Sequence, residues 1–166
     1  MQDIRNHPWL QALRVYTKPQ ILAMVFLGFS AGLPFLLVFS TLTAWLTDAG
    51  VSRSVIGFFG WVGIPYSIKF FWAPVIDRLP LPVLTSLLGR RRGWMLLAQL
   101  GIASGLGAMS LIDPATQTTT LALLALLVAF SSATQDIVID AWRIESVKST
   151  YQGAMATAYV GGYRVA

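Results

Sequence analysis

The stretch between residues 72 and 94 reads WAPVIDRLPLPVLTSLLGRRRGW, and a long apolar run lies on each side of it. It carries the pair Asp77-Arg78 and, closer to the second run, the cluster GRRRG at residues 89–93. Dense positive charge between apolar segments is typical of a loop on the cytoplasmic side of a membrane. The stretch therefore predicts two membrane-spanning helices joined by a cytoplasmic connection.

The composition of the whole chain also indicates a membrane protein. Hydrophobic residues make up 55% of the 166 residues and charged residues only 11%, and the mean hydropathy is +0.65. Soluble domains carry about 25% charged residues. The net charge is +5, but the basic residues cluster at the ends of apolar segments and form no stripe of the kind that binds nucleic acid. We therefore expect a lipid bilayer as a partner and no nucleic acid.

The residue types that most enzymes and metal sites need are missing from the apolar runs. The chain has no cysteine, and its only histidine, His7, lies in the polar leader. Thiolate ligands are therefore absent, and neither a histidine metal site nor a serine–histidine pair can form inside the spans. The sequence predicts neither an enzyme nor a metal centre.

The apolar runs predict an all-α membrane protein with about five transmembrane helices. The 26 uncharged residues from Ile21 to Leu46 exceed the roughly 20 that a crossing requires. Apolar residues at helical spacing among the charges of residues 1–20 indicate a leader with a short interfacial helix. The remaining residues, 21–166, form a partial transmembrane bundle with spans near residues 21–46, 55–72, 94–112, 121–139 and 152–166.

Lysine and arginine residues in the connections predict the orientation. The leader, the second connection and the fourth connection together carry nine, whereas the first and third together carry one, Arg53. Positive charge collects on the cytoplasmic side of a membrane. We therefore expect a multi-pass protein with its N-terminus in the cytoplasm.

The loop between the second and third spans resembles the signature of the major facilitator superfamily of secondary transporters. It departs from the usual form because Ala73 stands in place of glycine and residues 79–88 form a long insertion. In this longer form it is similar to the AmpG family of muropeptide permeases. Other stretches resemble the same family: LGFSAGLP (27–34), AWLTDAG (44–50), PYSIKF (65–70), QDIVIDA (135–141) and YVGGYR (159–164).

The resemblance implies a secondary active transporter. Such a protein would import anhydro-muropeptides, built on N-acetylglucosamine and anhydro-N-acetylmuramic acid, from periplasm to cytoplasm across a bacterial inner membrane. Proton symport would drive the import without a bound cofactor, in the service of peptidoglycan recycling and β-lactamase induction. The acetyl-coenzyme A transporters share related motifs, so acetyl-coenzyme A or another organic anion is an alternative substrate. A membrane scaffold that transports nothing is an alternative of another class.

The resemblance also implies that the chain is the N-terminal part of a major facilitator bundle. The fifth apolar run continues to Ala166, and a sixth helix would complete a six-helix repeat. We expect a truncated chain whose missing partner is the C-terminal half of the transporter. Substrate sites of such transporters lie between two repeats, so the 166 residues alone are expected to insert but not to transport.

Five charged residues are predicted to serve proton coupling or gating. Asp136, Asp140 and Arg143 recur at i, i+4 and i+7, which places them on one face of the fourth span near its cytoplasmic end. In one interpretation they pair with Asp77, Arg78 and the basic loop and lock one access state. In another, one carboxylate takes up and releases a proton in each cycle. In the third interpretation, these residues form a purely structural ion pair.

Five residues are candidates for substrate binding. Arg164 lies some 12 residues into the fifth span, where an arginine needs an anionic substrate or an internal acid as partner. Lys69 lies about one turn from the cytoplasmic end of the second span, so its stem can also reach the lipid headgroups. Tyr66, Gln135 and Tyr163 offer hydrogen bonds to sugar or peptide groups, or they simply pack between helices.

Small residues and a proline predict how the spans pack. Gly28 with Gly32, and Gly101 with Gly105, form GxxxG steps that let helices approach closely. Pro34 removes one backbone donor inside the first span, which predicts a bend there.

Overall fold

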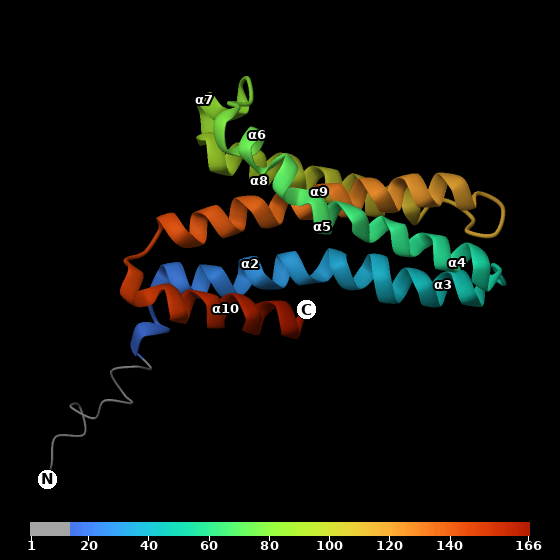
Figure 1. Cartoon of the computed structure of the whole chain (residues 1–166), viewed down its shortest axis with the longest axis horizontal. Helices are drawn as coiled ribbons and strands as arrows, with labels where there is room; N and C mark the ends of the chain where they lie inside the picture. The colour runs from blue at the N-terminus through green and yellow to red at the C-terminus, as the bar shows by residue number, and fades with distance from the viewer. Residues whose placement is uncertain (1–13) are drawn as a thin grey trace, which may run out of the picture. The chain divides into compact units, whose positions relative to one another are not determined.

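The computed structural model describes residues 14–166, and nearly all of them are helical (Figure 1). His7 and most of the predicted interfacial helix lie outside the described residues. No β-strand occurs between residues 14 and 166, which confirms the predicted all-α class. The main helices are α2 (Pro19–Leu36), α3 (Leu42–Asp48), α4 (Arg53–Phe59), α5 (Ile64–Ile68), α6 (Ala73–Arg78), α7 (Leu84–Leu88), α8 (Arg90–Met109), α9 (Thr118–Glu145) and α10 (Gln152–Val165).

Three continuous helical stretches are long and apolar enough to cross a membrane. They are Pro19–Asp48, Arg53–Phe71 and Thr118–Glu145. The predicted third span corresponds to α8, whose first turn consists of arginines and leaves a shorter apolar part, and the fifth corresponds to the 14-residue α10. Membrane crossing by α8 and α10 stays a prediction.

Two of these stretches are irregular inside the membrane-spanning part. A π-helical segment, η2 (Leu37–Thr41), joins α2 to α3 three residues after Pro34. Proline cannot donate a backbone hydrogen bond, and wider π-turns are one way in which a helix adjusts its register near such a site. The Thr43 hydroxyl donates a hydrogen bond to the Phe39 carbonyl over 2.6 Å, which adds a partner within the segment.

The stretch Arg53–Phe71 contains two 3₁₀ segments, η3 (Gly60–Gly63) and η4 (Lys69–Phe71). A Cβ atom at Gly63 would lie only 3.1 Å from the Phe39 ring. The absence of a side chain at Gly63 therefore lets the first 3₁₀ segment approach the π-helical segment closely.

The chain divides into two compact units, one with residues up to Leu33 together with Ile139–Ala166, and the other with Pro34–Val138. In the first unit, the early turns of α2 lie beside α10 (Figure 1). A Cβ atom at Gly28 would overlap the Tyr159 backbone, and one at Gly162 would overlap the Val25 carbonyl. The two helices thus meet backbone to backbone, and the close approach at Gly28 is the one that the glycine spacing predicted.

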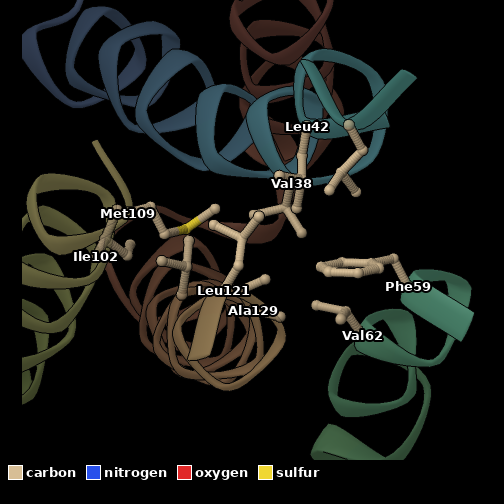
Figure 2. Close-up of a cluster of buried hydrophobic side chains, with 11 residues drawn as sticks. Val38, Leu42, Phe59, Val62, Ile102, Met109, Leu121 and Ala129 are labelled. Atoms are coloured by element: carbon tan, nitrogen blue, oxygen red, sulfur yellow. The ribbon is translucent and has the colours of Figure 1, made fainter. Parts of the chain in front are cut away.

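The second unit has an apolar core formed by residues from several helices, shown in Figure 2. The buried side chains are Val38, Leu42, Leu46, Phe59, Val62, Ile102, Met109, Leu121, Ala125, Val128 and Ala129. Glycines again permit close approach, because a Cβ atom at Gly105 would lie 2.6 Å from the Val128 side chain. This core fixes α9 against the two irregular stretches.

The glycine contact in the first unit is testable with two adjacent residues of α10. We expect Gly162→Ala to lower the free energy of unfolding by about 1–3 kcal/mol, because the added methyl group meets backbone atoms that cannot turn away. Gly161→Ala is the control, since nothing lies within 4 Å of the place that its Cβ atom would take, and alanine favours a helix by up to about 1 kcal/mol. Unfolding in mixed micelles measures both. Equal effects at the two positions would contradict the packing.

Candidate functional site

The middle of α9 carries an unusual run of buried polar side chains. Ser131, Ser132, Thr134 and Gln135 are each less than 9% exposed, and Ser132 and Gln135 are fully buried. Polar groups inside a membrane-spanning helix are costly unless they face other polar groups or a functional pathway. This run therefore marks the part of α9 with the strongest requirement for polar partners.

An ion pair joins this polar run to the second irregular stretch. The Lys69 ammonium lies 3.6 Å from the Asp136 carboxylate, and the side chains are 33% and 14% exposed. Lys69 begins the 3₁₀ segment η4, whereas Asp136 follows the polar run directly. Because both charges are partly shielded from solvent, their attraction is stronger than that of a surface pair.

An aromatic cluster lies one turn before Lys69. The Tyr66 ring meets the Phe35 ring edge-on, with ring centres 5.5 Å apart, and its centre lies 6.1 Å from that of Phe39. The Tyr66 hydroxyl is shielded from solvent. The buried Tyr66 hydroxyl therefore belongs to a residue whose ring packs against two apolar rings.

The basic loop, which is the connection between residues 72 and 94, is folded onto itself. Gly89, with a φ of +82°, makes the turn that separates α7 from α8. Arg91, in the first turn of α8, then lies 2.5 Å from the carboxylate of Asp77 at the end of α6. The Trp94 indole donates a second link, a hydrogen bond of 3.0 Å to the Leu79 carbonyl. Arg78, beside Asp77, is exposed.

The other predicted charged residues belong to the first unit. Asp140 and Arg143 form an ion pair of 3.3 Å within α9. The Arg143 guanidinium also lies 6.0 Å from the centre of the Tyr159 ring, and Tyr159 and Tyr163 have ring centres 6.0 Å apart. Arg164 is exposed in the last turn of α10.

The connection between α9 and α10 is held by side chains at both of its ends. The Gln152 amide donates to the carbonyls of Arg143, Ile144 and Val147, and these bonds satisfy groups at the end of α9. The Lys18 ammonium lies 3.5 Å from the centre of the Tyr151 ring. A hydrogen bond to Lys18, followed by the charge of that lysine, lowers the pKa of the Tyr151 hydroxyl.

The structure therefore places several of the predicted residues in ion pairs. Lys69 lies with Asp136, Asp77 with Arg91, and Asp140 with Arg143. Sequence reasoning did not identify Arg91 individually, although it did identify the GRRRG cluster that contains Arg91. It gave Lys69 the substrate or the lipid headgroups as partner and did not identify Asp136, because nothing in the local sequence links Lys69 to Asp136.

The described residues show no cluster suited to a metal ion. Among residues 14–166, no three histidine, aspartate or glutamate side chains gather as a metal ligand set requires.

Comparisons with known proteins identify the relatives of the chain. A family model described as acetyl-coenzyme A transporter 1 matches residues 20–114. The anhydromuropeptide permease of Escherichia coli (strain K12) is 41% identical over 155 residues, which are 93% of this chain and 31% of the relative. A Rickettsia conorii protein named putative transporter AmpG 4 is 33% identical over 156 residues, 94% of this chain and 37% of the relative. No solved structure matches the chain.

These comparisons confirm the resemblance to AmpG permeases that the loop and span motifs predicted. The names permease and transporter are not those of enzymes. The chain spans about a third of the length of the relatives that it matches. Because the family match covers more than half of the 166 residues, the chain belongs to the acetyl-coenzyme A transporter 1 family of membrane proteins, and it is similar throughout to the AmpG permeases.

Proposed function

We propose that the chain is part of a secondary active transporter that imports anhydro-muropeptides from periplasm to cytoplasm by proton symport. The observation that carries this proposal is the 41% identity, over 93% of the chain, to a permease named for that substrate. The transporter would lie in the inner membrane with its N-terminus in the cytoplasm, as the nine positive residues in alternate connections favour. It would serve peptidoglycan recycling.

The Lys69–Asp136 pair supports a role for Asp136 in proton coupling. The pair lies between two stretches that are apolar enough to cross a membrane, next to the buried Gln135. Protonation of the Asp136 carboxylate would remove its charge and with it the attraction for Lys69. The ammonium would then be available to a carboxylate of the substrate, and loss of the proton would restore the pair. Lys69 would thereby link proton binding to substrate binding.

The Asp77–Arg91 pair supports a role in gating. It joins the end of α6 to the start of α8, so the two helix ends cannot separate while the pair is intact. A gate at this loop would open and close with that pair. The further candidates for gating are Arg78, after the second span, and Asp140 and Arg143, both near the predicted cytoplasmic end of the fourth span.

Arg164 is the proposed anion contact. Its guanidinium is exposed in α10, one residue after Tyr163, and guanidinium groups bind carboxylates through two parallel hydrogen bonds. Muropeptides carry carboxylates on their peptide part. Tyr66, Gln135 and Tyr163 would add hydrogen bonds to sugar or peptide groups.

The family match favours a second candidate substrate. The matching model is described by acetyl-coenzyme A transport, and it covers residues 20–114. Coenzyme A conjugates are also anionic, so the same arginine and lysine would suit them. Competition between the two substrates distinguishes the candidates.

We expect right-side-out membrane vesicles that contain the full reading frame around this chain to accumulate labelled anhydro-muropeptide. The vesicles come from cells without their own permease, and a protonophore should abolish the accumulation because the proton gradient drives it. Excess unlabelled muropeptide should compete and acetyl-coenzyme A should not. Uptake of labelled acetyl-coenzyme A without uptake of labelled muropeptide would support the second candidate. Vesicles with inserted protein and no uptake of either compound would support a scaffold.

The coupling role of Asp136 predicts a split between two transport assays. Asp136→Asn should abolish accumulation against a gradient, because an amide cannot carry the proton. It should retain counterflow, the exchange of labelled for unlabelled substrate, which needs no net proton movement. Asp48→Asn is the control, because Asp48 is an exposed carboxylate at the end of α3.

A gating residue should behave differently in the same assays. Arg91→Gln should slow counterflow as well as accumulation, since both require the gate to open and close.

Accumulation by the Asp136→Asn variant at the wild-type level would refute the coupling role. Equal loss of both activities in that variant, with normal insertion, would make Asp136 structural.

The anion contact predicts a change in apparent affinity. Arg164→Gln should raise the muropeptide concentration for half-maximal uptake about tenfold or more, because a hydrogen bond to a charged group contributes about 1.5–3 kcal/mol. Arg164→Lys should have a smaller effect, since lysine keeps the charge but not the planar fork. Lys148→Gln, at an exposed cation outside the helices, is the control. An unchanged half-maximal concentration in Arg164→Gln would exclude the contact.

A further inference from the structure

An apolar cavity lies within the second unit, and its lining includes neither Lys69 nor Asp136. Its volume is about 190 Å³, and α6, α8 and α9 each contribute to its wall. The lining includes Trp72, Val75, Trp94 and Leu97, with Phe130 on the side of α9. The Trp72 and Phe130 ring centres lie 4.8 Å apart. Ring and aliphatic surface therefore dominate the wall.

The polar atoms of the two tryptophans are already engaged inside the protein. The Trp72 indole donates to the Thr134 hydroxyl over 3.2 Å, and the Trp94 indole donates to the Leu79 carbonyl over 3.0 Å. Neither N–H group is left to orient a polar ligand. The wall is therefore suited to an apolar ligand, such as a hydrocarbon chain.

A second, more open hollow adjoins this cavity and carries positive charge. Its volume is about 360 Å³, and it is lined by Pro74, Val75, Arg78 and Leu79. Val75 lines both spaces, so the two meet at this residue. A molecule with an apolar chain and a charged head can thus place the chain against the tryptophans and the head beside Arg78.

The charge balance around the hollow requires an anionic head. Asp77 is the only carboxylate between residues 72 and 94, and it pairs with Arg91. Arg78, Arg90 and Arg92 are exposed and add positive charge. Arg90 and Arg92 also stand in the first turn of α8, where the positive end of the helix dipole adds to their charge.

We propose that the cavity and the adjoining hollow bind one anionic glycerophospholipid of the surrounding bilayer. Part of one acyl chain occupies the cavity between Trp72 and Trp94, and the phosphate lies beside Arg78. Basic pockets between membrane helices on the cytoplasmic side are known to suit anionic headgroups. The lipid would fill the space between the ends of α6 and α8, next to the Asp77–Arg91 pair.

The test is lipid retention by the purified 166-residue chain in detergent, measured by native mass spectrometry. The chain is incubated with equal amounts of phosphatidylglycerol and phosphatidylethanolamine. We expect about fivefold more phosphatidylglycerol adduct, and Arg78→Gln should bring the ratio close to one, because a basic residue near a membrane surface contributes that much to anion binding. Arg53→Gln, which removes the same charge from the start of α4, is the matched control and should keep the ratio.

A second variant tests the position of the acyl chain. Val75 is 49% exposed at the rim, so Val75→Trp should obstruct both spaces without disturbing the core and should reduce phosphatidylglycerol retention below that of the unchanged chain. Leu111→Trp, at a residue 86% exposed outside the cavity, is the control. Far-UV circular dichroism verifies that all variants keep their helices. Equal retention of the two lipids, retention unaffected by either site variant, or chain dimers in place of lipid adducts would overturn the proposal.

Discussion

A positive and a negative charge, 3.6 Å apart between membrane-spanning stretches, set the main physical constraint on this chain. Neither Lys69 nor Asp136 is stable as an isolated ion in hydrocarbon, so the helices that carry them must lie together. The small residues at the helix contacts make such proximity possible, for example Gly63 against the Phe39 ring. The polar run of α9 adjoins Asp136 and adds buried hydrogen-bonding groups at the same level of the helix. The close helix packing and the buried polar groups of α9 therefore follow from one requirement, that the ion pair remain enclosed by protein.

The backbone obeys a related constraint, because its polar groups also need partners inside a membrane. A π-segment and two 3₁₀ segments interrupt the first two spanning stretches, and each keeps its hydrogen bonding within the chain. The π-segment follows Pro34, which removes one donor and so disturbs the regular ladder. Irregular turns of this kind often occur at functional sites. Here the second 3₁₀ segment begins with Lys69, so the ion pair and the departure from regular helix coincide.

The sequence predicts the features that depend on local pattern. Apolar length and the absence of charge predicted the first, second and fourth spanning stretches, and the spacing of Gly28 and Gly32 predicted a close helix contact at these residues, without its partner. The helix α8 begins at Arg90, before the span expected from residue 94, because the turn at Gly89 lets the arginines begin the helix. The Lys69–Asp136 pair could not be predicted from local sequence pattern. Its partners lie far apart in the sequence, and helical periodicity says nothing about which faces of distant helices meet.

The energetics of buried charge favour a functional origin for that pair. Replacing a buried ion pair with apolar residues of similar size is often neutral or stabilising, so ion pairs are a poor means of holding helices together. The same chain holds helices together without charge elsewhere, where Gly28 and Gly162 bring two backbones into contact. Lys69 and Asp136 could therefore have been apolar without loss of packing. The proposed coupling role would give them a reason to be charged, because a carboxylate next to an ammonium can lose and regain its charge by exchanging one proton.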